Sequence, residues 1–304
     1  MENENLKIEL QNLTKDYGAS RGIFDLNLKI NEGEMLGFVG TNGSGKTTTI
    51  RSILGFIQPT SGRACVNGLT SWEHSPEIVK DIGYVPGEIA FPDLPTGTAF
   101  IKSQAEFLHL KDMSRANEII AKLQLDTKAT LKRMSKGMKQ KTAIVAAFMA
   151  EPDIYLLDEP TTGLDPLMRD AFLDLVKEEH KKGKTILMSS HMFEELEPLC
   201  DRCALISNGH IVEVADMKKI RNPEEREYKI EFHQREQYER FKTENFEIVR
   251  DQIQYQQLTI KIKTTDINNL FTVLENYDVR MIVEVPFTLE KYFKGILASK
   301  GGDN

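Results

Sequence analysis

The sequence predicts an α/β fold, a parallel sheet covered by helices, followed by a small α+β domain. Three observations lead to this prediction. Strand-like and helix-like segments alternate through most of the chain, and a glycine-rich loop at residues 40–49 joins a buried strand to a helix. Near Pro223 a charged cluster, "MKKIRNPEEREYK", indicates a linker to segments of a different pattern. We therefore expect domains at residues 1–220 and 221–304.

Apolar and polar residues alternate with the period of strands at residues 8–17 and 24–30, and residues 35–40 form a continuous apolar run, as in a buried strand. Further strands are expected at residues 153–159, 184–190 and 202–214. Helical spacing of apolar residues predicts helices at residues 47–57, 97–110, 114–125, 136–151 and 168–183. Strands that alternate with helices in this way predict a parallel sheet.

The last part of the chain has a different order of elements. Residues 226–232, 257–263 and 279–285 read as strands, and residues 235–241, 266–277 and 288–297 read as helices. We interpret this part as a β-α-β-β-α-β domain of the ferredoxin-like type.

Composition and charge exclude several classes of protein. The chain has 304 residues and a net charge of -7, with no run of five or six basic residues, so nucleic acid is not expected as a partner. The acidic start "MENENLKIEL" is unlike a secretory signal, and no apolar run reaches the ~18 residues of a membrane span. We expect a soluble chain whose membrane role, if any, comes through a partner. Cys200 and Cys203 have metal or redox spacing, but with one further cysteine, Cys65, buried reduced thiols are favoured.

The glycine-rich loop has the residues of a phosphate-binding loop. Gly40, Gly45, Lys46 and Thr47 satisfy G-x-x-x-x-G-K-[ST], and Gly43 adds a further glycine. A loop without side chains lets several backbone N–H groups approach a polyphosphate together, and the following helix adds the positive end of its dipole. Lys46 would span the β- and γ-phosphates, and the Thr47 hydroxyl would ligate Mg²⁺. A plain glycine turn would not need the lysine and threonine, so the sequence predicts an ATP site on a P-loop NTPase core.

Two adjacent carboxylates end a predicted buried strand at Asp158 and Glu159. Asp158 can hold the Mg²⁺ shell, and Glu159 can polarise an attacking water. An acidic strand-to-loop junction is common by itself, but here a phosphate loop precedes it and "TTGLDP" follows it.

Over residues 6–220 the chain resembles the ATP-binding-cassette (ABC) ATPases. "GTNGSGKTT" resembles the Walker A loop of this family, "IYLLDEP" its Walker B strand, and "MSKGMKQ" its signature segment. "TGLD" resembles the D-loop, which ends at Asp165; His191 in "SSHM" resembles the switch histidine; and Tyr17 stands where the family stacks an aromatic ring on adenine. Six motifs in order at family spacing make the resemblance specific. It also implies a helical subdomain at about residues 88–148.

The resemblance implies a role for each matching residue. The ATP-binding residues would be Tyr17, Gly40, Thr41, Asn42, Gly43, Ser44, Gly45, Lys46, Thr47 and Thr48. The metal ligands would be Thr47 and Asp158, and the catalytic residues Glu159, His191 and Lys46. Ser135, Lys136, Gly137 and Met138 would contact ATP bound by an opposing subunit, so that two chains close head to tail with Asp165 at the seam. The cofactors expected are ATP and Mg²⁺.

The sequence departs from the family pattern at two places. The switch loop has Gly87 and Glu88 where the family usually has glutamine, so that either Glu88 reaches the Mg²⁺ or water position or this contact is missing. The signature has Lys136 and Met138 where glycine and glutamine are commoner, and Lys136 would add positive charge near the phosphates.

A single cassette without a membrane span resembles the separate ATPase subunit of an ABC transporter. The tail "VEVPFTLEKYFKGIL" resembles that of exporter ATPases that serve drug, antimicrobial-peptide or lipid permeases, although its apolar face also fits simple packing. We therefore expect a homo- or heterodimeric ATPase, peripheral at the cytoplasmic face of the cell membrane, that energises a separate permease. The alternative is a cytosolic ABC ATPase that acts on a ribosome or nucleic-acid complex. A switch that dimerises with little hydrolysis is disfavoured by Glu159.

Overall fold

The computed structural model describes residues 6–301, and the chain divides into two compact units, Met1–Val214 and Ala215–Asn304. The division lies a little before residue 220, where the sequence led us to place the domain boundary. The helix α8 (Met217–Arg221) contacts α11 (Leu289–Gly301), which places this helix with the second unit.

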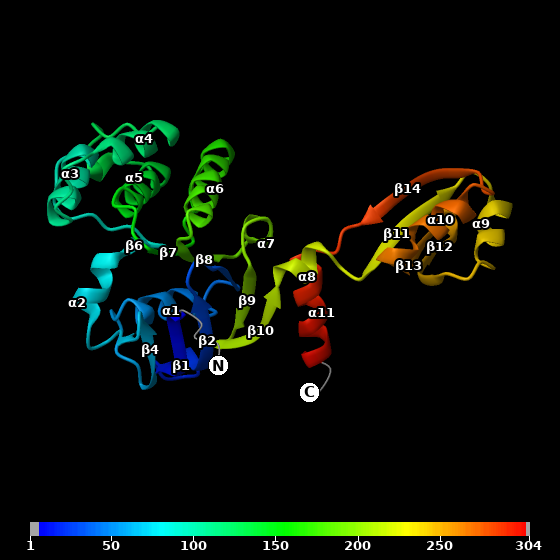
Figure 1. Cartoon of the computed structure of the whole chain (residues 1–304), viewed down its shortest axis with the longest axis horizontal. Helices are drawn as coiled ribbons and strands as arrows, with labels where there is room; N and C mark the ends of the chain where they lie inside the picture. Colours follow the sequence, from blue (N-terminus) through cyan, green and yellow to red (C-terminus); the bar gives the residue numbers. More distant parts are fainter. Residues whose placement is uncertain (1–5, 302–304) are drawn as a thin grey trace. The chain divides into compact units, whose positions relative to one another are not determined.

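A sheet of six strands in the order β10-β9-β3-β8-β7-β6 forms the centre of the first unit (Figure 1). Its strands are β10 (His210–Asp216), β9 (Arg202–Ser207), β3 (Met35–Val39), β8 (Thr185–Ser190), β7 (Ile154–Asp158) and β6 (Ile82–Val85). The strands β9, β3, β8, β7 and β6 are paired in parallel, which confirms the predicted parallel sheet. Every residue of β3, β7 and β8 is buried, so these strands read as apolar runs. Their carboxyl ends meet at one edge of the sheet, where ligands of open α/β sheets bind.

A separate antiparallel sheet, in the order β2-β1-β4-β5, accompanies the parallel one. It is built from β1 (Leu6–Asp16), β2 (Gly22–Asn31), β4 (Ser61–Val66) and β5 (Leu69–Thr70). The sequence predicted the first two strands but not that they form a sheet of their own. The helix α1 (Lys46–Ile53) contacts β2, β4 and β7, so it packs between the two sheets and is anchored by the buried Ile50 and Ile53.

Three helices form a group of their own in the first unit. They are α3 (Gly97–Phe107), α4 (Ser114–Lys122) and α5 (Lys136–Phe148), and α5 contacts the other two (Figure 1). An ion pair of 2.6 Å between Arg115 of α4 and the wholly buried Glu179 ties this group to α6 (Pro166–Lys181). The Tyr155 hydroxyl donates to the same carboxylate at 3.1 Å. Two short helices complete the unit, α2 (Ser75–Ile78) and α7 (Phe193–Leu196).

The second unit has one antiparallel sheet in the order β12-β13-β11-β14. Its elements follow the chain as β11 (Glu225–Phe232), α9 (Arg235–Phe241), β12 (Glu247–Gln252), β13 (Gln257–Lys263), α10 (Ile267–Leu274) and β14 (Val279–Val285), and α11 follows them. This is the predicted β-α-β-β-α-β order. The sequence pattern did not predict β12, because this edge strand is almost wholly exposed and lacks a buried face. The core includes Ile230, Phe232, Tyr238, Phe241 and Leu258.

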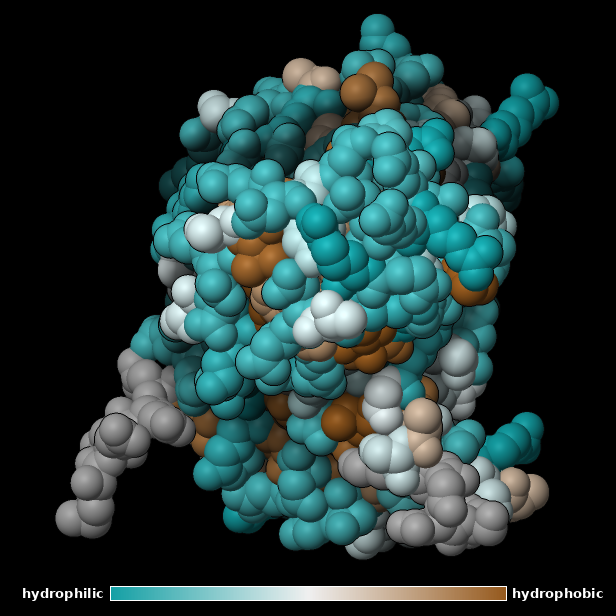
Figure 2. Space-filling model, turned by 90° about the vertical axis from the view of Figure 1, so that its right-hand side faces the viewer, coloured by the Kyte–Doolittle hydropathy of each residue, from teal (hydrophilic) through white to brown (hydrophobic). Residues whose placement is uncertain are grey.

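The surface is mostly hydrophilic on the face shown in Figure 2, with smaller hydrophobic areas between the polar side chains. Over residues 6–301 the structure contains no helix that combines the length and the apolar character of a membrane span. Large apolar side chains such as Phe38, Phe148 and Phe172 are fully buried instead.

Cys65, Cys200 and Cys203 carry thiols that are not joined in disulfides, as the sequence predicted. Cys200 and Cys203 are buried against β3, where a Cβ atom added to Gly37 would come within 2.9 Å of the Cys200 sulfur. Burial raises the pKa of the Cys203 thiol, which keeps it protonated and inert.

The ion pair between His180 and Asp201 makes stability depend on pH. His180 lies in the last turn of α6, and its Nε2 atom lies 3.0 Å from a carboxylate oxygen of Asp201. The hydrogen bond to Asp201 raises the pKa of His180 above its usual 6.5, and this outweighs the opposite effect of burial. The stabilisation is therefore fully present below that usual value and is lost as the pH rises through the raised pKa.

We predict that His180→Gln lowers the free energy of unfolding at acidic pH and has less effect at alkaline pH. For a partly exposed pair the loss near pH 6 should be up to about 1 kcal/mol. Urea unfolding of both proteins near pH 6 and pH 9 measures it. An equal loss at the two pH values would contradict the assignment.

Candidate functional site

The loop Gly40–Gly45 connects the end of β3 to the start of α1 through conformations that favour glycine. Gly43 and Gly45 have φ angles of 80° and 116°, and a Cβ atom on Gly40 would lie 2.4 Å from the Ile206 carbonyl oxygen. The Ser44 hydroxyl is buried and has no hydrogen-bond partner among residues 6–301. This unsatisfied group and Gly43, where an added Cβ atom would meet nothing within 4 Å, form a cradle that suits an anion.

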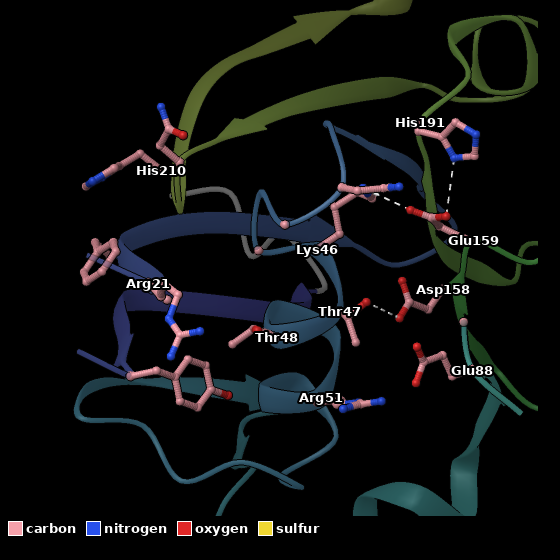
Figure 3. A pocket seen from close by; sticks show the side chains of 18 of the residues that line it. Arg21, Lys46, Thr47, Thr48, Arg51, Glu88, Asp158, Glu159, His191 and His210 are labelled. Atoms are coloured by element: carbon pink, nitrogen blue, oxygen red, sulfur yellow. Dashed lines mark hydrogen bonds and ion pairs between the residues drawn. The ribbon is translucent and has the colours of Figure 1, made fainter. Parts of the chain in front are cut away.

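The Lys46 side chain lies inside this loop and is only 4% exposed. Its Nζ atom donates to the carbonyl oxygens of Gly40 at 2.7 Å and Thr41 at 3.1 Å. The same atom lies 3.1 Å from Glu159 Oε1, which is the carboxylate that balances its charge (Figure 3). A lysine buried in this way needs an anionic partner, and a phosphate can take that place.

The Asp158 carboxylate joins three elements at the carboxyl edge of the sheet. Thr47, at the start of α1, donates to its Oδ2 atom at 2.7 Å, and Ser189, at the end of β8, donates to its Oδ1 atom at 2.8 Å. The Ser189 hydroxyl also accepts a hydrogen bond from the backbone N–H of Glu159 at 3.0 Å. The hydroxyl and the carboxylate are hard oxygen ligands, so Thr47 and Asp158 fit the coordination chemistry of Mg²⁺.

Glu159 lies between Lys46 and His191. Its Oε2 atom is 3.3 Å from His191 Nδ1, and its Oε1 atom contacts Lys46 (Figure 3). The backbone of Glu159 has a φ angle of 45°, a left-handed conformation that costs about 1–3 kcal/mol in a residue with a side chain. This strained backbone turns the side chain away from the sheet and into the cavity.

The switch loop, with Gly87 and Glu88, lies beside the carboxylate of Asp158. A Cβ atom on Gly87 would meet the backbone oxygen and a side-chain oxygen of Asp158, both at 3.3 Å. Figure 3 shows the Glu88 carboxylate on the side of the cavity where Asp158 and Thr47 lie. Three oxygen-bearing side chains therefore face one region.

These groups line one cavity of about 1330 Å³. The predicted site residues in its wall are Tyr17, Asn42, Gly43, Gly45, Lys46, Thr47, Thr48, Gly87, Glu88, Lys136, Asp158, Glu159 and His191. Tyr17 is 49% exposed, and Lys15 Nζ lies 5.4 Å from the centre of its ring. Phe24 and His210 stack at 5.4 Å and form another part of the wall.

The predicted signature residues stand at the start of α5. The Ser135 hydroxyl accepts a hydrogen bond from the Met138 N–H at 3.2 Å and so caps the helix. A Cβ atom on Gly137 would lie 2.6 Å from the Gly163 carbonyl oxygen, so this helix start packs backbone to backbone on the loop that ends at Asp165. Of these residues only Lys136 lines the cavity; Ser135, Gly137, Met138 and Asp165 do not.

The chain is similar to proteins of one known family. The family model described as ABC transporter matches residues 23–162. The chain is 36% identical over 212 residues to the bacitracin transport ATP-binding protein BcrA of Bacillus licheniformis, which is 68% of either protein. It is 34% identical over 214 residues to the linearmycin resistance ATP-binding protein LnrL of Bacillus subtilis, again 68% of each. The chain belongs to the ABC transporter ATP-binding family.

Solved structures of the family resemble this ABC ATPase closely. The structure of the ATP binding subunit of an ABC transporter has a TM-score of 0.65 and 30% sequence identity, over 71% of this chain and 92% of that one. The dimeric bacterial ABC transporter cassette MJ0796 has a TM-score of 0.63 and 26% identity, over 69% and 98%. The same cassette is also known in a dimeric state after hydrolysis, bound to ADP and Pi. This chain is thus an ATPase with a P-loop NTPase core.

Several cavity residues of this ABC ATPase were missed from the sequence. They are Asp16, Ser20, Arg21, Gly22, Phe24, Arg51, Thr162, Asn208 and His210. They come from the end of β1, the turn after it, β2, α1, the loop after Glu159, the turn before β10 and β10 itself. Apart from Thr162, which begins the segment "TGLD", no motif contains them. For Arg51 a signal was available, because it follows Thr47 by four residues and so lies on the same face of α1.

Ser189 was also missed, although "SSH" had drawn attention to His191. We predict that Ser189→Ala lowers the free energy of unfolding by about 1–3 kcal/mol, because it leaves the Glu159 N–H and one oxygen of the buried Asp158 without partners. Urea unfolding measures the loss. Ser61→Ala, at an exposed position of β4, is the control and should change stability little. An equally small loss in both variants would contradict the role of Ser189.

Proposed function

We propose that this ABC ATPase binds ATP with its β- and γ-phosphates in the loop Gly40–Thr47 and its base near Tyr17. The support is the cradle itself, in which Lys46 is held by two carbonyl oxygens of the loop and the Ser44 hydroxyl is free to donate. Bound phosphate oxygens would replace Glu159 as the anionic partner of Lys46. The chain of events at the site therefore begins with the release of Glu159 from Lys46.

The residues present also fit Mg²⁺. Thr47 and Asp158 would hold the ion, since their oxygens already lie together on the side of the cavity reached by the loop. When bound, Mg²⁺ would neutralise part of the charge on the phosphates. Asp158 is kept in position for this by its second hydrogen bond, from Ser189.

Glu159 is the group that we assign to hydrolysis. Once it leaves Lys46, its carboxylate can accept a proton from an attacking water, and His191 at 3.3 Å can hold it in orientation. The single observation that carries this proposal is the placement of one strained, partly exposed carboxylate between Lys46 and His191.

We propose that two chains close head to tail around ATP. Ser135, Lys136 and Asp165 are exposed in the single chain, as residues that meet a second subunit would be. The dimeric cassette MJ0796 is a structural relative and supports this arrangement. The helix dipole of α5 would then point its positive end at the phosphates held by the other subunit.

We propose that the chain is a peripheral subunit at the cytoplasmic face of the cell membrane and energises the permease of an exporter. In this proposal residues 1–220 are the ATPase domain, residues 88–148 its helical subdomain, and residues 221–304 an accessory domain. The relatives named for bacitracin transport and linearmycin resistance favour an exporter of peptides, drugs or lipids over a protein that acts on ribosomes.

We predict that Glu159→Gln lowers kcat for ATP hydrolysis by roughly 100-fold or more, because the amide cannot accept the proton from water. ATP affinity should be equal to or higher than that of wild type, since the loop is unchanged and the charge that competes with phosphate for Lys46 is removed. Phosphate release and fluorescent-nucleotide binding measure the two quantities. Size-exclusion chromatography with MgATP should show a dimer, and Lys46→Ala in the same background should abolish it. Normal turnover by Glu159→Gln would overturn the assignment.

The transport role has its own test. The Glu159→Gln protein, extracted in detergent with MgATP from its native cells, should bring down a membrane protein with several spans in stoichiometric amount. Recovery of ribosomal proteins instead would refute the transporter proposal while leaving the ATPase assignment intact.

We propose that Glu88 adds a second carboxylate at the Mg²⁺ position. Glu88→Gln should then weaken Mn²⁺ binding in the presence of ATP by roughly tenfold, since affinity follows the charge of the ligands. Electron paramagnetic resonance of free Mn²⁺ measures this without turnover. Glu73→Gln, exposed near α2, is the control. If Glu88→Ala leaves both Mn²⁺ affinity and ATP turnover unchanged, Glu88 has no part in the site.

A further inference from the structure

Glu195 is a buried carboxylate to which the ATPase mechanism assigns no function. It lies on α7, after His191, and is only 3% exposed. The groups that donate to its Oε2 atom are two neutral hydroxyls, Ser190 Oγ at 2.7 Å and Thr161 Oγ1 at 3.0 Å. Its Oε1 atom is buried and has no hydrogen-bond partner among residues 6–301. A carboxylate is expensive to bury with such partners, so packing alone does not account for it.

The two donors come from the two segments that flank the reacting groups. Thr161 follows Glu159 and belongs to the loop that runs to Asp165, the N-cap of α6. Ser190 ends β8 immediately before His191, and its hydroxyl also accepts a hydrogen bond from the Met192 N–H at 3.0 Å. Glu195 therefore joins the segment 161–165 to the segment 189–192 through one oxygen atom.

The segment 189–192 contacts or contains both residues of the proposed hydrolysis, Glu159 and His191. Glu159 is attached to β8 through Ser189, and His191 follows Ser190 directly. A shift of the loop that ends at Asp165 would reach His191 through Thr161, Glu195 and Ser190, each held by a hydrogen bond of 3.0 Å or less. Thr162, the next residue in this loop, has a buried hydroxyl without a hydrogen-bond partner among the described residues. One hydrogen-bonding group of the loop is therefore unsatisfied in the single chain.

We propose that Glu195 is a positioning residue that couples the Asp165 loop to His191. When a second subunit presses on this loop, Glu195 transmits the displacement to the segment of His191, which in turn sets the orientation of Glu159. The proposal rests on the proposed hydrolysis at Glu159 and adds to it the residue through which the dimer contact acts.

The test is Glu195→Gln, which keeps the shape of the side chain but removes its charge. We expect kcat for ATP hydrolysis to fall by roughly tenfold or more, while KM and nucleotide affinity stay within about twofold. Glu194→Gln, at the exposed neighbouring position, is the matched control and should hydrolyse ATP as the wild type does. A residue with a merely structural role would lower thermal stability and nucleotide affinity together with kcat.

A double-mutant cycle tests the coupling itself. Thr161→Val and Ser190→Ala each remove one donor and keep the carboxylate, so they remain informative where Glu195→Gln folds poorly. In the cycle of Thr161→Val with Glu195→Gln, the double variant should be little slower than the slower single variant, because both changes break one connection. Losses in kcat that multiply would show that the residues act independently and would overturn the proposal, as would a kcat for Glu195→Gln within twofold of wild type.

The proposed hydrolysis and the proposed positioning role are contradicted by different results. If Glu159→Gln retains wild-type turnover, the proposed hydrolysis is wrong and the role of Glu195 falls with it. If Glu159→Gln is inactive and Glu195→Gln is as active as wild type, only the positioning role is wrong.

Discussion

The hydrogen bonds that Asp158 receives from Thr47 and Ser189 join the first helix, the strand β7 and the strand β8 at one point. Asp158 itself has no exposed surface, so burying its charged carboxylate without these donors would destabilise the fold. The parallel order of the strands is what brings the three residues together, since their carboxyl ends share one edge of the sheet. The phosphate loop on one side and Glu159 on the other take their positions from this junction.

Charge balance stabilises the buried lysine of the site. Lys46 is almost fully buried, and Glu159 neutralises it at 3.1 Å. The same carboxylate contacts His191, so it is shared between a residue that binds phosphate and a residue near the reacting water. Binding of an anion at Lys46 and release of Glu159 are thus linked by electrostatics, since one cation cannot keep both partners equally well.

The sequence was sufficient for those parts of the protein that depend on contiguous residues. The phosphate loop, the buried strands β3, β7 and β8, and the helices around them were predicted because their patterns are local. Phe24 and His210 could not be foreseen as neighbours, since their contact arises only when β2 and β10 are brought together in the fold. The edge strand β12 was missed for a different reason: it has no buried face and so leaves no alternation in the sequence. Glu195 looked like one of several acidic residues, and only its burial distinguishes it.

The close approach of Gly137 to Gly163 restricts which substitutions the family signature can accept in this chain. A side chain at residue 137 would clash with the carbonyl oxygen of residue 163. Residue 163 itself has a φ angle of 85°, a conformation that disfavours any residue other than glycine. The side chain of Lys136 also packs over Gly163, since a Cβ atom added to Gly163 would lie 3.0 Å from the Lys136 Cγ atom, but this contact is made by a flexible side chain and not by the backbone. This chain departs from the common signature at Lys136 and Met138 and keeps glycine at 137. In this chain, therefore, one backbone contact requires glycine at position 137. Side chains with other chemical properties can be introduced into the signature only at the neighbouring positions.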